Sequence, residues 1–368
     1  MPDTISIIIP CRNEEAYIRP CLASVLAFQL PPRVHTEVLL LDGRSTDHTR
    51  DIIDELATKD PRVRWVDNPG ITQSCAMNRG LDLARGRWIM RLDAHTIYPP
   101  DYLLRCHETA VRTGAANVGG ICITQPGGTG YQAQLVQALT THKFGVGDSG
   151  FRTGATAGQR DTVPFGFFRR ELFDKIGRFD ERLIRAQDYE FNRRIAAAGQ
   201  TVWLDPRIQS RYFNQPTLQA FYRKQFLHEA PYNAYLWYLA PYAFAPRHAI
   251  TGVFALGVLG GLTLSPLTPW IAWPFAGVMG LYTLMAILSA AQQAVRYRRP
   301  LHALVLPFCF FGFHFLHGLG VLAGLVKLAT GTAPVQKIHE PWPGAGFSRV
   351  SISLGLHSDI VQKDSASP

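Results

Sequence analysis

The chain has 368 residues, of which 47% are hydrophobic and 18% are charged, and it carries a formal net charge of +9. Soluble domains usually have about 25% charged residues, and the deficit is local, since residues 248–295 and 300–326 contain no Asp, Glu, Lys or Arg. The basic residues form no stripe with interleaved aromatic side chains, which argues against a nucleic-acid partner and favours a cytosolic surface beside anionic membrane lipids.

The six cysteines indicate a reducing compartment. They form no CxxC pair and lack the histidine spacing of a zinc site, so we expect small buried thiols. Arg12, Glu14 and Glu15 directly follow the first apolar stretch, which does not fit a signal peptide. We therefore expect the N-terminal domain to stay in the cytosol.

Short apolar runs alternate with helical patterns over the first 92 residues. Strands are predicted at residues 5–9, 37–41, 63–66 and 88–92, and helices at residues 14–28, 49–56 and 74–84. This alternation predicts a mostly parallel, doubly wound α/β sheet. Ligands of such sheets bind beyond the carboxyl ends of the strands, where Pro10, Asp42 and Asp93 lie.

The segment 145–168 is rich in Gly, Thr and aromatic residues and has little periodicity, as is typical of a long functional loop. Helices are predicted after it at residues 171–177 and 189–198, and a strand at residues 201–204. We assign all of this to one N-terminal domain, residues 1–230.

Three apolar segments, residues 249–264, 270–291 and 301–326, predict a transmembrane bundle over residues 248–327, because about 20 apolar residues span a bilayer. The alternative, a large soluble core, would be interrupted more often by polar turns. The aromatic segment 231–247 predicts an interfacial helix, since Tyr and Trp favour the level of the lipid headgroups.

The charges of the loops predict the orientation of these spans. Residues 265–269 carry no positive charge, whereas residues 296–299 contain three arginines, and positively charged loops stay in the cytosol. The N-terminal domain is then cytosolic in a multi-pass protein of the cell's inner or plasma membrane. The tail, residues 328–368, is expected to be partly disordered and outside, unless the third span is re-entrant.

The triplet Asp93-Ala94-His95 follows the fourth predicted strand. An aspartate and a histidine at positions i and i+2 can hold one side of a hard divalent cation, and Mg²⁺ or Mn²⁺ there would bridge the two phosphates of a diphosphate. The alternative is that His95 only caps a turn.

Asp188 lies at the start of a predicted helix, in the run Gln187-Asp188-Tyr189-Glu190. A carboxylate at such a place is most often an N-cap. The functional alternative is a general base, which takes the proton from an acceptor hydroxyl as its oxygen attacks an anomeric carbon.

Four stretches, in this order and spacing, resemble the family-2 inverting glycosyltransferases with a GT-A fold. They are IIIPCRNEE (7–15), LLDGRSTDHT (40–49), MNRGLDLARGRWIMRLDAHT (77–96) and FGFFRRELFDKIGRFDERLIRAQDYEFNRR (165–194). The resemblance covers residues 5–206 and is greatest to membrane-anchored exopolysaccharide enzymes of the succinoglycan-biosynthesis type. It implies an α/β GT-A domain at the N-terminus, followed by an all-α transmembrane bundle.

The resemblance also implies roles for the residues that match its motifs. Pro10, Arg12 and Glu14 line the nucleotide pocket, and Asp42 lies near the base or the ribose. The family often has two adjacent acids where this chain has Asp42-Gly43, so the preference for a base is open.

The remaining implied roles concern the reaction itself. Asp93 and His95 form the metal and diphosphate site, with Mg²⁺ or Mn²⁺ as the cofactor, although Asp-x-His replaces the usual Asp-x-Asp. Asp188 is the catalytic base, and Glu190 and Arg194 support its position. The usual Glu before the base is a glutamine here, which spares the base a neighbouring negative charge.

We therefore expect an inverting glycosyltransferase that moves a sugar from a nucleotide-sugar donor, expected to be UDP-linked, to a hydroxyl of a lipid-linked saccharide. Its expected context is exopolysaccharide or cell-surface glycan synthesis, with membrane lipids as further partners. The QxxRW motif of processive synthases is absent near Gln225, which favours transfer of one sugar per encounter.

Other interpretations stay open. The main alternative is a membrane scaffold that binds a nucleotide without catalysis. A nucleotidyltransferase is disfavoured, because the loop at residues 10–14 contains no glycine. His314 and His317 in the third span fit helix-packing hydrogen bonds better than a metal or proton site.

Overall fold

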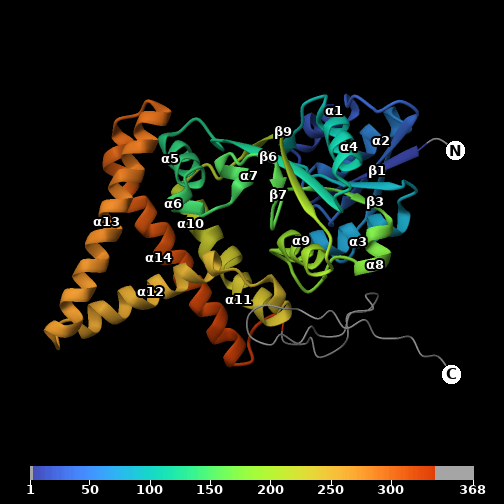
Figure 1. Ribbon diagram of the computed structural model, residues 1–368. Coiled ribbons are helices and arrows are strands. Elements are labelled where there is room, and N and C mark those ends of the chain that lie inside the picture. The colour runs from blue at the N-terminus through green and yellow to red at the C-terminus, as the bar shows by residue number, and fades with distance from the viewer. Residues whose placement is uncertain (1–2, 336–368) are drawn as a thin grey trace, which may run out of the picture.

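The computed structural model describes residues 3–335, in which an α/β unit is joined to three long helices by a layer of shorter ones (Figure 1). The long helices come last in the chain and are α12 (Pro246–Leu264), α13 (Pro269–Tyr297) and α14 (Leu301–Ala329). An α/β domain followed by a helical region, as predicted from the sequence, is confirmed.

Nine strands form one mixed sheet in the α/β unit. In chain order they are β1 (Asp3–Cys11), β2 (Val34–Asp42), β3 (Val63–Asp67), β4 (Trp88–Arg91), β5 (Thr96–Ile97), β6 (Asn117–Gln125), β7 (Gly158–Gln159), β8 (Gly166–Arg169) and β9 (Val202–Phe213). The spatial order is β3-β2-β1-β4-β8-β6-β9-β5, with β7 paired to β9. The first four strands pair in parallel, whereas β8 runs antiparallel to β4 and β6. The predicted mostly parallel sheet is therefore confirmed.

Helices cover both faces of this sheet, because successive side chains of a strand point to opposite faces. Ile7 of β1 packs in a buried cluster with one set of helices, and Ile8 packs in a second cluster with another. The helices of this region are α1 (Ile18–Leu26), α2 (Thr49–Lys59), α3 (Gln73–Leu83), α4 (Tyr102–Thr113), α7 (Gly150–Thr153), α8 (Glu171–Ile176) and α9 (Gln187–Ala197). The carboxyl ends of β1, β2 and β4 consequently meet at one edge between two helical layers.

A connecting layer of short helices lies between the sheet and the long helices (Figure 1). It consists of α5 (Tyr131–Thr140), α6 (Lys143–Val146), α10 (Leu218–Lys224), the π-helical segment η1 (Gln225–Glu229), α11 (Ala230–Leu239) and the 3₁₀ turn η2 (Pro241–Ala243). The turn η2, and α11 apart from its first residue Ala230, fall within the segment 231–247 that was predicted to be interfacial. The domain boundaries expected from the sequence stay predictions.

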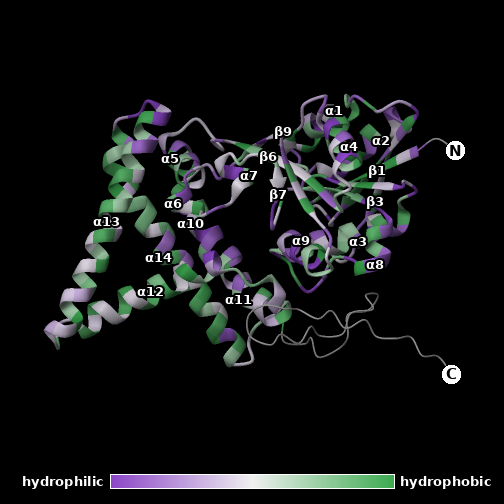
Figure 2. Cartoon of the chain, in the orientation of Figure 1, coloured by the Kyte–Doolittle hydropathy of each residue, from purple (hydrophilic) through white to green (hydrophobic). Residues whose placement is uncertain are grey.

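Each of the three long helices is long and apolar enough to cross a membrane. Apolar residues dominate all three helices in Figure 2. In α13, Trp270 is 89% exposed and Trp273 is 78% exposed. Apolar surface of this extent requires lipid or a partner to cover it, which supports the three predicted spans as candidate membrane helices.

Two histidines of α14, His314 and His317, make hydrogen bonds to neighbouring helices. His314 Nδ1 lies 2.8 Å from Tyr282 Oη, and His317 Nδ1 lies 2.8 Å from Thr251 Oγ1. Within residues 3–335 no group of three metal-ligating side chains is present. These contacts agree with the packing role favoured by the sequence.

Both ends of α14 contact the N-terminal part of the chain. At its start, Tyr131 Oη of α5 lies 3.1 Å from His302 Nδ1. Beyond its end, Ala333 and Val335 lie in one buried cluster with Leu183 and Tyr189 of the α/β unit. A helix of 29 residues is about 44 Å long. Because both of its ends pack against segments that precede the long helices in the chain, the geometry favours a third helix that returns along the membrane surface over one that carries the tail outside.

We predict that α12 and α13 cross the membrane as a hairpin and that the C-terminus lies on the same side as the N-terminus. A reporter that fluoresces only in the cytosol is expected to be bright when fused before Met1 or after Pro368. The same reporter inserted at Leu267, between α12 and α13, is expected to be dark. A bright N-terminal fusion with a dark C-terminal fusion would contradict this topology.

Candidate active site

The ends of three parallel strands place polar side chains at one edge of the sheet. Cys11 of β1 is in register with Asp42 of β2, so the end of β1 with Pro10, and the loop after it with Arg12 and Glu14, lie beside Asp42. On the other side of β1, Ile8 is in register with Arg91 of β4, so Asp93 follows at the same edge. The structure thus gathers the strand-end residues that the sequence predicted.

Arg91 connects Asp93 to Asp188, although these aspartates are far apart in the sequence. Its Nη2 donates to Asp93 Oδ1 at 2.8 Å, and its Nη1 lies 3.8 Å from Asp188 Oδ2. A second connection runs through two amides, since Gln73 Nε2 donates to Asp93 Oδ1 at 3.0 Å and Gln187 Nε2 donates to Gln73 Oε1. The two predicted reaction residues therefore share one site.

Arg91 was not predicted from the sequence as a residue of this site. Its side chain is only 5% exposed, and an arginine in the otherwise apolar four-residue strand β4 is the signal that would have revealed it, because arginine is rarely buried without a partner. Burial disfavours the charged form, but the carboxylates of Asp93 and Asp188 raise the pKa of Arg91 above its usual value. The guanidinium therefore stays charged between the two acids.

Asp188 lies in the first turn of α9 and does not cap it. The N-cap is Ala186, whose φ of 61° places it in the left-handed region, a strained conformation for an alanine. The side chain of Asp188 is 39% exposed. A carboxylate that is held near Arg91 and open to solvent can reach a substrate.

His95 is paired with Glu14 across the edge of the sheet. Its Nδ1 lies 3.1 Å from Glu14 Oε1, and its side chain is 38% exposed. Desolvation disfavours protonation of His95, but the hydrogen bond to Glu14 and the charge of Asp93 together raise its pKa above the usual value. Because Nδ1 is used by Glu14, Nε2 is the ring nitrogen that is left for a ligand.

The donor set at this edge fits a cation that arrives with a diphosphate. No group of three or more His, Cys, Asp or Glu side chains within residues 3–335 forms a ready metal cage. Mg²⁺ is usually held by only one or two carboxylates together with substrate phosphates, and Mn²⁺ also suits carboxylate and phosphate oxygens. Arg91 and Gln73 both donate to Oδ1 of Asp93, so Oδ2 and the imidazole of His95 are suitable ligands.

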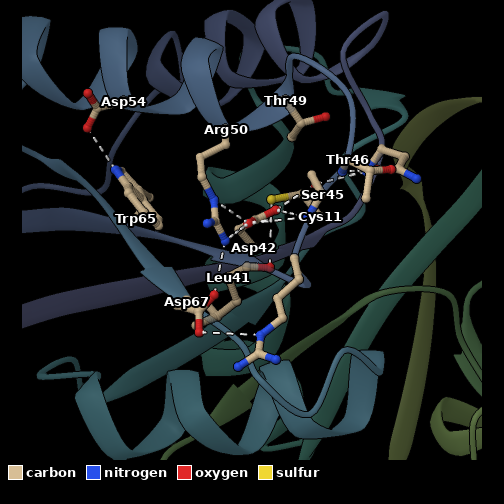
Figure 3. Close-up of polar contacts among 12 residues, drawn as sticks. Cys11, Leu41, Asp42, Ser45, Thr46, Thr49, Arg50, Asp54, Trp65 and Asp67 are labelled. Atoms are coloured by element: carbon tan, nitrogen blue, oxygen red, sulfur yellow. Dashed lines mark hydrogen bonds and ion pairs between the residues drawn. The ribbon is translucent and has the colours of Figure 1, made fainter.

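Asp42, which was predicted to lie near the base or the ribose, is enclosed by hydrogen bonds at the end of β2. The residue is fully buried, Ser45 Oγ donates to its Oδ1 at 2.6 Å, and Arg50 Nε donates to its Oδ2 at 2.9 Å (Figure 3). Arg50 also donates to Asp67 at 3.0 Å. Since both of its carboxylate oxygens accept hydrogen bonds, Asp42 fixes the loop that follows β2. Arg50 and Asp67, which continue this set of contacts, are partly exposed.

The structure explains why a glycine, rather than a second acid, follows Asp42. A Cβ atom built on Gly43 would lie 2.7 Å from the carbonyl oxygen of Ile71, so any side chain here would push the loop that precedes α3. A base-contacting acid therefore does not fit at this position unless the backbone moves.

Glu190 and Arg194 form a buried ion pair inside α9, at a distance from the exposed edge. Arg194 Nε donates to Glu190 Oε1 at 2.8 Å, and the side chains are 2% and 4% exposed. The hydroxyl of Tyr242 also donates to Glu190. The pair joins α9 to the turn η2 and so orients the helix that carries Asp188.

Comparisons with known proteins agree with this architecture. The sequence profile of Glycosyl transferase family 2 matches residues 6–177. The succinoglycan biosynthesis protein ExoA of Rhizobium meliloti is 35% identical over 222 residues, which cover 60% of this chain and 66% of that protein.

A second relative extends beyond the α/β unit. The dolichyl N-acetyl-α-D-glucosaminyl phosphate 3-β-D-2,3-diacetamido-2,3-dideoxy-β-D-glucuronosyltransferase of Methanococcus voltae is 27% identical over 341 residues, 88% of this chain and 97% of that one. Among solved structures, a mannosyltransferase of Pyrobaculum calidifontis in complex with GDP-Man and Mn²⁺ has a TM-score of 0.51 at 20% identity. It covers 89% of this chain and 88% of that chain, and at this identity it shows the fold alone.

We predict that Arg194→Met lowers the free energy of unfolding by about 3–5 kcal/mol, because it leaves the carboxylate of Glu190 buried without its charged partner. Thermal unfolding of the full chain in detergent, followed by near-UV circular dichroism, measures the change. Lys175→Met is the control, since its pair with Glu171 is 3.9 Å apart and exposed, and such pairs contribute little. Equal melting temperatures for both variants would contradict the claim that the Glu190–Arg194 pair holds α9 against η2.

Proposed function

The chain belongs to glycosyl transferase family 2, and from this we propose that it transfers a sugar, with inversion, from a nucleotide-sugar donor to a hydroxyl of a lipid-linked saccharide. One observation carries the proposal: Arg91 holds Asp93 and Asp188 at a single site. In the proposed reaction, Asp93 serves the diphosphate and Asp188 serves the incoming alcohol.

Asp188 is the general base of the proposed reaction. It takes the proton of the acceptor hydroxyl as the oxygen forms a bond to the anomeric carbon and the bond from that carbon to the diphosphate breaks. Asp188 suits this step because its carboxylate is partly exposed and Gln187, rather than an acid, precedes it. The leaving nucleoside diphosphate takes the bonding electrons and needs no proton from the protein.

Asp93 and His95 are the proposed ligands of Mg²⁺ or Mn²⁺, with Glu14 orienting the imidazole through Nδ1. When bound, the cation supplies charge stabilisation to the diphosphate oxygens. Pro10, near the end of β1, and Arg12, on the loop after it, are the proposed residues of the nucleotide pocket. Asp42 acts on the nucleotide only indirectly, by fixing Ser45 and Arg50.

The acceptor and the cellular context are inferred from the helices and from the relatives. The candidate membrane helices pack against the connecting layer, since Arg296 Nη1 donates to the carbonyl of Thr141 at 3.1 Å, and we propose that this packing keeps a lipid-borne sugar close to the site. The names of the relatives refer to succinoglycan biosynthesis and to a dolichyl-linked sugar. We therefore propose exopolysaccharide or cell-surface glycan synthesis on the cytosolic face of the inner or plasma membrane.

We predict that Asp188→Asn abolishes transfer but leaves donor binding intact, because the amide keeps the shape of the side chain and removes the base. The assay uses the purified full chain, membrane lipid extract and radiolabelled UDP- and GDP-sugars, with and without Mn²⁺ after treatment with EDTA. Removal of the base is expected to lower the rate at least about 100-fold.

Two outcomes would overturn parts of this proposal. Wild-type turnover in purified Asp188→Asn would refute the assignment of the base. Binding of donors by the wild-type chain without turnover, across all donors and lipid fractions, would favour the nucleotide-binding scaffold. Glu171→Gln is the control variant, because Glu171 is an exposed carboxylate on α8.

A further inference from the structure

Two adjoining pockets lie on the connecting layer, and they differ in chemistry. The first, here called the apolar groove, has a volume of about 730 Å³ and is lined chiefly by Leu218, Tyr222, Phe226, Leu227 and Leu316. The second, here called the basic pocket, has a volume of about 400 Å³ and includes Arg223, Lys224 and His228. Gln219 and Arg223 line both, so the basic pocket opens directly beside the groove.

One wall of the apolar groove belongs to a candidate membrane helix. Leu316 comes from the middle of α14, and Tyr222 Oη donates to the carbonyl of Cys309 on the same helix at 3.1 Å. A Cβ atom on Gly320 would lie 2.6 Å from the carbonyl oxygen of Phe226, so small residues of α14 allow η1 to approach closely. The groove is therefore continuous with the part of the chain that meets lipid.

The basic pocket has charge available for an anion. Arg223 is exposed, and no carboxylate within residues 3–335 forms an ion pair with it. Lys224 Nζ lies 3.6 Å from Glu229 Oε1, with both side chains about one-third exposed. The segment η1 that follows is a π-helix, a rare conformation that is often found at functional sites.

The chain connects the basic pocket to the candidate active site. Tyr212 of β9 is in register with Thr96, and its ring centroid lies 6.0 Å from that of His95. Thr217, which caps α10 and lines the basic pocket, follows five residues later. Five residues span at most about 18 Å when extended, so the backbone of Thr217 lies no farther than that from the backbone of Tyr212. A short saccharide attached to an anion in the basic pocket is long enough to reach the candidate active site.

We propose that these two pockets bind the acceptor lipid: the apolar groove takes the hydrocarbon chain of a polyprenyl-type lipid, and the basic pocket takes the phosphate or diphosphate between that chain and its sugar. The inference rests on the proposed function and specifies its acceptor site. Charge complementarity selects this occupant, because an apolar groove alone would accept any hydrocarbon chain, whereas Arg223, Lys224 and His228 at its end require an anionic headgroup.

Native mass spectrometry of the full chain in detergent tests the proposal without requiring transfer. The probes are a polyprenyl phosphate, the corresponding polyprenol and phosphatidylglycerol. We expect the wild-type chain to retain the polyprenyl phosphate in preference to both others. The double variant R223Q/K224Q is expected to bind it at least about tenfold more weakly, the loss of a charge-assisted hydrogen bond, and to bind the polyprenol unchanged.

Two further variants separate the pockets and control for charge. L227Q, at an exposed position of the groove, is expected to weaken polyprenyl phosphate and polyprenol alike. The double variant R85Q/R87Q, at two exposed positions just before β4, is the charge-matched control and is expected to bind as the wild type does. Unchanged binding in R223Q/K224Q would overturn the proposal, as would equal retention of phosphatidylglycerol and polyprenyl phosphate, which would identify a general anionic-lipid site.

The same variants distinguish failure of this inference from failure of the proposed function. In the transfer assay, R223Q/K224Q is expected to raise the KM for the lipid acceptor at least about tenfold and to leave the KM for the nucleotide sugar unchanged. Selective lipid binding without transfer from any donor would contradict the proposed function alone. Transfer with an unchanged acceptor KM would contradict the lipid site alone.

Discussion

The organisation of the site depends on one buried cation. Arg91 ends β4 inside the sheet, contacts Asp93 two residues later, and faces Asp188 on a helix that begins almost 100 residues further along the chain. Without a positive charge between them, two carboxylates at one edge would repel each other and disfavour a shared site. The guanidinium is fixed by burial, and its fork presents two separate N–H groups to the two acids. Its charge thus brings a strand end and a helix start into one site.

The membrane part extends this arrangement. The pair of Glu190 and Arg194 fixes α9 against η2, and η2 leads directly into the first long helix. Helix α14 then packs back on the connecting layer, with both of its ends against the N-terminal part of the chain. The candidate active site, the connecting layer and the candidate membrane helices are therefore linked by successive contacts.

Local patterns predicted those features that depend on neighbours in the sequence. The alternation of the first four strands and three helices followed from periodicity, and Asp93 and Asp188 followed from motif order. The strands β6 and β8 were not predicted, because β8 enters the sheet between β4 and β6 through long-range pairing. The burial of Asp42 could not be predicted from the sequence pattern either, since it depends on Arg50, which lies on the next helix. Arg91 was hidden because it sits within an apolar strand. The chemical roles of the site residues stay predictions.

The kinetics of Arg91 variants test the central claim most directly. Arg91→Met removes the charge between the two carboxylates, and Arg91→Lys keeps the charge but loses the forked geometry. We expect kcat for sugar transfer to fall about 10- to 100-fold in Arg91→Met, as expected for loss of a charge-assisted hydrogen bond and an ion pair, and to be partly restored in Arg91→Lys. Melting curves recorded in parallel separate this effect from unfolding. A folded Arg91→Met chain with wild-type kcat would contradict the claim that this arginine assembles the site.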